Sequence, residues 1–143
     1  LSSSAGIPVL HRLPVIGTFH SVIIQGIADR FPMLRWGFVE VSAQWVPYAL
    51  NDLGIRFRNR GKQFAGRELM RKCRMYVACQ TTDDLEHVLE CAGEDSIVIG
   101  TDYGHHDTSS EIDALRKLKA NGKVSPVAVD KILGDNPKAL YGL

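Results

Sequence analysis

Several features are scarce or absent in this sequence, and each absence argues against a class of protein. The 143 residues include only three cysteines, Cys73, Cys79 and Cys91, and no C-x-x-C spacing. This argues against a zinc knuckle or a disulfide framework and indicates reduced thiols, so we expect a cytoplasmic protein. Seventeen basic residues nearly balance sixteen acidic ones, so neither nucleic acid nor an anionic membrane surface is an expected partner.

Long apolar runs and common catalytic motifs are also missing. No stretch is apolar over the length that spans a bilayer. The chain has no Walker-type phosphate loop, G-x-G-x-x-G, G-x-S-x-G or H-E-x-x-H. The start "LSSSAGIP" lacks the basic and apolar regions of a signal peptide. We expect residues 1–17 to be a leader or linker and residues 18–143 to form the folded part.

The residues present predict strands that alternate with helices. Apolar stretches rich in β-branched or aromatic residues predict strands at residues 34–41, 75–79 and 96–101. Helical spacing and terminal signals predict helices over residues 19–30, within 45–57 after a loop, and over 67–72, 83–92, 110–121, 125–134 and 136–143. This order is typical of an α/β fold with parallel strands buried on both faces.

Two of these helices carry recognisable starts. Asp83 is followed by Glu86 at the spacing of a capping box. Ser125 precedes Pro126, and proline suits the first helical turn. We therefore expect Asp83 and Ser125 to be N-caps, and Gly134 to end the helix that Ser125 begins.

The strand ends suggest where chemistry could occur, because functional groups of parallel α/β folds gather at the C-terminal ends of strands. The residues near these ends are Glu40, Ser42, Gln44 and Trp45 after the first strand, Cys79 and Gln80 after the second, and Asp102, Tyr103, His105, His106 and Asp107 after the third. Asp102 is the best candidate, since a carboxylate there can bind a divalent metal or accept a proton from metal-bound water. A turn-forming or capping aspartate is the alternative.

Glu40 and the two histidines have weaker assignments. Glu40 lies between Val39 and Val41 in the predicted strand, where a carboxylate is costly unless it is paired. This favours a functional role over a salt bridge. Adjacent His105 and His106 should diverge, so at most one of them faces the site, and His105 is nearer the strand end. The basic stretch at residues 58–74 is interpreted as a solvated connection with a short helix.

Three segments in order resemble one family. "GIADRFPMLRWGFVEVSAQWVP", "IVIGTDYGHHD" and "KILGDNPKALYGL" resemble the sixth strand, the eighth strand and the closing segment of amidohydrolase-superfamily enzymes. They are most similar to the metal-dependent branch that includes aminocarboxymuconate-semialdehyde decarboxylase. The resemblance implies the C-terminal portion of a (β/α)₈ TIM barrel, with about three of the eight parallel strands.

The resemblance also implies roles for individual residues. Asp102 matches the acid that binds or faces the metal and handles the proton of the attacking water. His105 matches a histidine that follows it, with Gly104 in place of proline. Glu40 stands where much of the branch has histidine, and is expected to be catalytic. Trp45 and Tyr103, with His105, are expected to contact a small-molecule substrate.

The metal-binding His-x-His pair of the family does not occur in this chain. A divalent metal, zinc being favoured, is therefore expected in the complete barrel and not bound tightly by this chain alone. The expected partner is the missing N-terminal barrel half or a companion chain, and oligomerisation is left open. The chain is interpreted as a segment of a hydrolase or decarboxylase (a lyase). The alternative is a non-catalytic α/β fragment that acts by association, and a flavodoxin-like domain fits less well.

Overall fold

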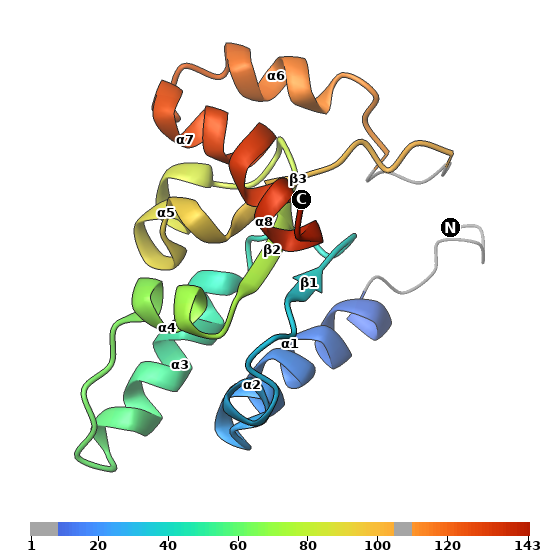
Figure 1. Ribbon diagram of the computed structural model, residues 1–143. Helices are drawn as coiled ribbons and strands as arrows, with labels where there is room; N and C mark the ends of the chain where they lie inside the picture. The colour runs from blue at the N-terminus through green and yellow to red at the C-terminus, as the bar shows by residue number, and fades with distance from the viewer. Residues whose placement is uncertain (1–8, 105–109) are drawn as a thin grey trace.

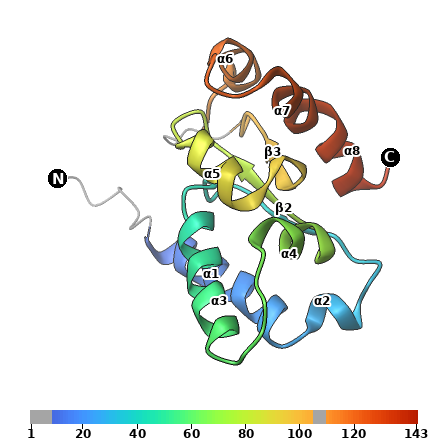
Figure 2. The same cartoon turned by 90° about the vertical axis from the view of Figure 1, so that its left-hand side faces the viewer.

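The computed structural model describes residues 9–104 and 110–143 of the chain (Figures 1 and 2). Its elements follow the predicted order of helices and strands. They are α1 (Val9–Ile24), α2 (Ile27–Arg30), β1 (Trp36–Phe38), α3 (Val46–Arg58), α4 (Gly66–Lys72), β2 (Met75–Cys79), α5 (Leu85–Ala92), a 3₁₀ turn (Glu94–Ser96), β3 (Ile97–Ile99), α6 (Ala114–Ala120), α7 (Pro126–Asp130), a π-helical turn (Lys131–Asp135) and α8 (Asn136–Tyr141).

The strands form one parallel sheet in the order β1-β2-β3. Trp36 aligns with Met75, and Val77 aligns with Ile97. Each connection between strands passes through helices, as a parallel pairing requires. The α/β class with three parallel strands is therefore confirmed. All three strands end at the same edge of the sheet, so the segments after β1, β2 and β3 meet there.

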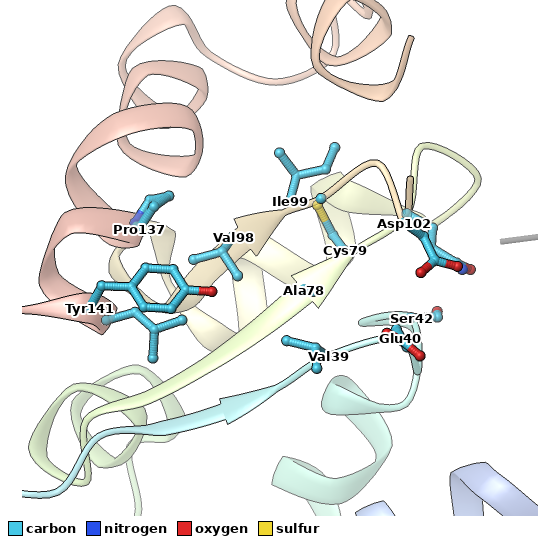
Figure 3. A pocket seen from close by; sticks show the side chains of 13 residues that line it. Val39, Glu40, Ser42, Ala78, Cys79, Val98, Ile99, Asp102, Pro137 and Tyr141 are labelled. Atoms are coloured by element: carbon cyan, nitrogen blue, oxygen red, sulfur yellow. The ribbon is translucent and has the colours of Figure 1, made fainter. Parts of the chain in front are cut away.

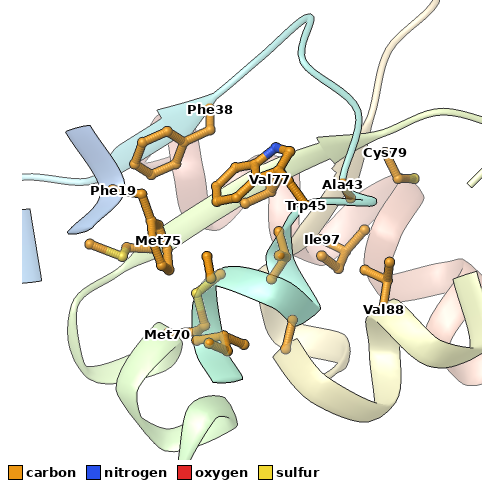
Figure 4. Packing of buried hydrophobic residues seen from close by; sticks show 14 of the residues in the cluster. Phe19, Phe38, Ala43, Trp45, Met70, Met75, Val77, Cys79, Val88 and Ile97 are labelled. Carbon is orange, nitrogen blue, oxygen red and sulfur yellow. The ribbon is translucent and has the colours of Figure 1, made fainter. Parts of the chain in front are cut away.

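The two faces of the sheet differ in burial. Met75, Val77 and Cys79 of β2 are buried in the cluster that also contains Met70 of α4 and Val88 of α5 (Figure 4). The alternate residues Tyr76 and Ala78 are half-buried. The prediction of burial on both faces was therefore wrong for β2, and also for β1, where Gly37 is exposed and Phe38 is buried. The reason is that helices pack fully against one face of the sheet, whereas α8 covers the other face only in part.

The N-terminal helix is longer and more broken than the pattern predicted. Helix α1 starts at Val9, includes Pro14 and ends at Ile24, so the expected boundary at residue 18 falls inside it. The prediction of one helix over residues 19–30 was wrong at Gly26, whose φ of 66° is left-handed. A right-handed helix cannot continue through that conformation, and the separate turn α2 follows.

Helix starts and ends give two corrections and one confirmation. The N-cap of α5 is Asp84, whose side chain accepts a hydrogen bond from the His87 backbone N–H at 3.3 Å. The prediction that Asp83 caps this helix was wrong. Ser125 caps α7 as predicted, accepting from Ala128 N at 3.1 Å. The helix does not end at Gly134, because a π-helical turn carries the chain into α8.

No helix in the described part of the chain is both long enough and apolar enough to cross a membrane.

Candidate active site

A hollow of about 220 Å³ lies along the half-covered face of the sheet and opens at the strand ends (Figure 3). Its floor contains Val39, Ala78 and Val98, one from each strand or its extension. Pro137, Leu140 and Tyr141 of α8 close one end. The remaining lining residues are Glu40, Ser42, Cys79, Gln80, Ile99, Gly100 and Asp102. The hollow is thus apolar at the α8 end and polar at the C-terminal ends of the strands.

Glu40 and Asp102 lie together at this polar end (Figure 3). Glu40 follows β1, Asp102 follows β3, and both have a left-handed backbone, with φ of 61° and 51°. Ser42 shares this conformation, with φ of 61°. Such conformations cost on the order of 1 to 3 kcal/mol for a non-glycine residue and cluster at functional sites. Because three such residues line one hollow, tertiary contacts must hold the backbone in this conformation against its local preference.

Asp83 holds the loop that carries Glu40. Its Oδ1 accepts from Ser42 Oγ at 2.5 Å, and its Oδ2 accepts from the backbone N–H groups of Ala43 and Gln80 at 2.8 and 2.9 Å. Ser42 and Ala43 follow β1, while Gln80 follows β2. One carboxylate therefore ties two neighbouring strand-end loops together and fixes the left-handed turn at Ser42.

Glu111 makes a second connection of this kind. Its carboxylate accepts from Thr81 Oγ1 after β2 and from Lys117 Nζ on α6, and its backbone N–H donates to Thr101 O at 2.9 Å. The Lys117 hydrogen bond, followed by that of Thr81, lowers the pKa of Glu111. The backbone of Glu111 thus contacts Thr101, the residue before Asp102, while its carboxylate contacts the loop after β2, so that one residue links the two strand-end segments.

The predicted site residues have different positions in the structure. Glu40 and Asp102 share the hollow, as expected from their strand ends. Glu40 lies beyond β1, which ends at Phe38, and is exposed. The premise that it is a carboxylate within an apolar strand was therefore wrong. Tyr103 is 83% exposed and does not line the hollow, and His105 lies outside the described residues together with His106 and Asp107.

Trp45 belongs to the core and not to the lining of the hollow. Its ring packs edge-on against Phe19 and Phe38, with centroids 5.2 and 5.9 Å away (Figure 4). It is 9% exposed. Trp45 is the N-cap residue of α3, and its side chain turns toward Phe19 of α1 and Phe38 of β1. Its contact with a substrate stays a prediction.

Cys79 lines the hollow but does not resemble an activated nucleophile. Burial raises the pKa of its thiol to about 12, and the nearby Asp83 carboxylate acts in the same direction. A thiol with this pKa is almost wholly protonated at neutral pH, and only the thiolate is nucleophilic. The side chain is a small core residue at the end of β2, as expected for a buried cysteine.

The described residues do not by themselves make a metal site. No group of three or more His, Cys, Asp or Glu side chains within them could hold an ion. A catalytic zinc takes about three protein ligands. The carboxylates of Glu40 and Asp102 are donors of a suitable kind, but further ligands would have to come from elsewhere.

Sequence reasoning missed the two connecting acids, Asp83 and Glu111. Asp83 and Asp84 are adjacent at the start of α5, and only one of them can cap the helix. The two adjacent aspartates therefore indicate that the one that does not cap α5 has a different role. No local pattern marks Glu111, because its partner Thr81 lies thirty residues away.

Comparisons with known proteins agree on one family. A family model described as Amidohydrolase matches residues 8–143. The structure is similar to that of an amidohydrolase from Mycobacterium avium subsp. paratuberculosis K-10, with a TM-score of 0.74 and 25% sequence identity over 94% of this chain. The chain spans 35% of the length of that protein. No match was found among curated proteins.

Proposed function

Because the chain belongs to the amidohydrolase family, we propose that it supplies the last three strands and the closing helices of a metal-dependent barrel enzyme. The remaining strands would come from a missing N-terminal barrel half or a companion chain. The reaction would be hydrolysis of a C–N or C–O bond, or decarboxylation of a small carboxylated substrate. A cytoplasmic location stays a prediction.

One observation supports this proposal above the others. The carboxylates of Glu40 and Asp102 lie at the C-terminal edge of a parallel sheet, on strained turns around one hollow. That edge is where barrel enzymes hold their reacting groups. The two connecting acids, Asp83 and Glu111, stabilise the loops on either side of β2.

The residues of this chain would divide the work at the strand ends. Asp102 would be one ligand of the metal or would accept the proton of the attacking water. Glu40 would orient the substrate or share a proton with it. Tyr103 and His105 would contact the substrate from the loop after β3. In the complete barrel a divalent cation, with zinc favoured, would supply an activated water, and no step is assigned to a metal held by this chain alone.

A second candidate function is association without catalysis. It is favoured by the lack of a three-ligand group among the described residues and by the half-covered sheet face. In this case the hollow would serve only as a surface on which another chain packs.

Native isolation of the particle that contains this chain distinguishes the two functions. An affinity tag on the chain would allow its molar mass, subunits and metal content to be measured by light scattering and mass spectrometry. We expect a complete barrel with a bound divalent metal. Asp102→Asn should lower the metal content or abolish turnover, whereas Asp130→Asn, an exposed aspartate on α7, should change neither.

Two outcomes would contradict the proposal. A well-folded, monomeric and metal-free particle would remove the enzymatic function for this chain and support the second candidate. Retained metal and turnover in Asp102→Asn would exclude Asp102 from the mechanism even if the barrel is complete.

A further inference from the structure

The basic stretch at residues 58–74, extended to Arg56 at the end of α3, forms one side of a cleft. Residues 56–74 hold eight of the seventeen basic residues and a single acid, Glu68. They cover the end of α3, the loop that follows and α4. This part of the molecule lies with α2 at the end away from α6 and α7 (Figures 1 and 2). Although the chain is nearly neutral overall, about half of its basic residues are therefore concentrated in this one segment.

The cleft has a volume of about 420 Å³ and lies between α1 and α2 on one side and α3, its following loop and α4 on the other. Four cationic side chains line it, from Arg56, Arg60, Lys62 and Lys72, against one carboxylate, from Asp29. The lining thus has a net charge of +3. Cys73 adds no opposing charge, because burial raises the pKa of its thiol.

Two of the four cationic side chains in the cleft are paired with carboxylates of the chain. Arg56 Nε donates to Asp52 at 2.7 Å, and Lys72 Nζ lies 3.1 Å from Asp29. No ion pair is found for Arg60 or Lys62 with any other described residue. Their two exposed charges face the cleft from the loop after α3, where they are available to an anion.

Apolar side chains line the cleft on both sides. Ile23 and Ile24 lie at the end of α1, across from the basic loop, whereas Phe57 of α3 and Leu69 of α4 lie on the same side as the cations. Low-dielectric walls beside charges of one sign strengthen the local electric field and concentrate counter-ions. An arginine fork also matches the oxygen geometry of phosphate. A ligand with both a charged and an apolar part would contact the basic and the apolar residues of the cleft together.

We propose that this cleft binds a small phosphate monoester with an apolar substituent. A dianionic phosphate suits a lining with a net charge of +3 better than a monoanion does. Arg60 and Lys62 contact the phosphate, Arg56 and Lys72 add to the field, and the substituent packs on Ile24 and Phe57. The site lies beyond the N-terminal end of β2, which α4 precedes, and so at the opposite end of that strand from the candidate active site.

Calorimetric titration of the chain with hexyl phosphate tests the proposal. We expect one saturable site with a Kd below about 1 mM at low salt. Inorganic phosphate and hexanoate should each bind more weakly, and hexanol should not bind. Raising the ionic strength from about 0.01 to about 0.15 M should weaken binding several-fold, because added salt screens the electrostatic attraction between the phosphate and the basic side chains.

Variants of the exposed loop residues supply the decisive comparison. The double variant Arg60→Gln, Lys62→Gln should lose at least about tenfold in affinity, since charge-assisted hydrogen bonds are lost. Lys119→Gln, an exposed lysine on α6, should keep the affinity of the parent chain. Circular dichroism would verify that both variants remain folded.

Three results would overturn the proposal. The first is no saturation by hexyl phosphate up to about 10 mM, a concentration at which any specific site of this kind would fill. The second is equal loss of affinity in Lys119→Gln, which would show attraction by overall charge only. The third is unchanged affinity in the Arg60→Gln, Lys62→Gln variant.

Discussion

Replacing Asp83 with alanine should destabilise the chain more than any other single change of an acid near the hollow. The side chain accepts three hydrogen bonds, from Ser42 Oγ and from the backbone N–H groups of Ala43 and Gln80. Removing it leaves three donors without an acceptor and leaves the left-handed turn at Ser42 without support.

The size of the effect follows from these contacts. A hydrogen bond to a charged group contributes about 1.5 to 3 kcal/mol, and an unsatisfied buried donor costs about 1 to 3 kcal/mol. Asp83 is only half-buried, so water replaces part of what is lost. We expect Asp83→Ala to lower the free energy of unfolding by about 3 kcal/mol, a large share of the 5 to 15 kcal/mol typical of a domain.

Two further variants calibrate this result. Asp83→Asn keeps an oxygen for Ala43 and Gln80 and a polar group for Ser42, and should cost only about 1 kcal/mol. Asp84→Ala removes an exposed N-cap and should also cost about 1 kcal/mol. Urea denaturation followed by circular dichroism measures all three changes.

The reasoning would be refuted if Asp83→Ala were no worse than Asp84→Ala. That result would mean that Asp83 acts as an ordinary cap or surface residue. A double-mutant cycle with Ser42→Ala gives a second test, because the two side chains are in contact and should show a coupling energy of about 0.5 to 3 kcal/mol.

Three other predictions concern Trp45 in the core, the relative reactivity of two cysteines, and the ion pair of Glu111. Trp45→Ala should lower the free energy of unfolding by about 3 to 5 kcal/mol, because it empties a packed aromatic cluster; a loss below about 1 kcal/mol in urea denaturation would contradict the core position. Half-buried Cys91 should be alkylated by iodoacetamide before buried Cys79, whose pKa is raised to about 12 by burial; peptide mass spectrometry would detect the reverse order. Lys117 lowers the pKa of Glu111 below its ordinary value of 4.5. The pairing therefore stabilises the fold at pH values well above 4.5, and this contribution is lost as the pH falls through the lowered pKa. Glu111→Gln should show a smaller loss of stability than the parent chain on acidification, and equal losses would refute the pairing.

Much of the fold could be predicted because its signals are local. The strand at Met75–Cys79 has its predicted bounds, and Ser125 and Pro126 start α7 as expected. These features depend on the residues that form them, through β-branched content, a side-chain cap and a fixed proline φ. The family resemblance likewise depends on short motifs, and the match of the Amidohydrolase family model to residues 8–143 agrees with it.

Local patterns predicted the order of helices and strands, the parallel sheet, and the acids at two strand ends. Each of these follows from nearby residues or from the rule that parallel strands end at one edge. The packing of the whole chain was needed to show that Asp83 joins two loops and that Trp45 is part of the core. It alone also showed that Glu40 lies beyond β1 on a left-handed turn. The positions of Asp83 and Trp45 depend on contacts between residues some twenty-five to forty positions apart, which no local pattern records. The same distinction holds for the basic residues 56–74, whose charge is plain in the sequence and whose cleft exists only because α1 and α2 pack opposite them.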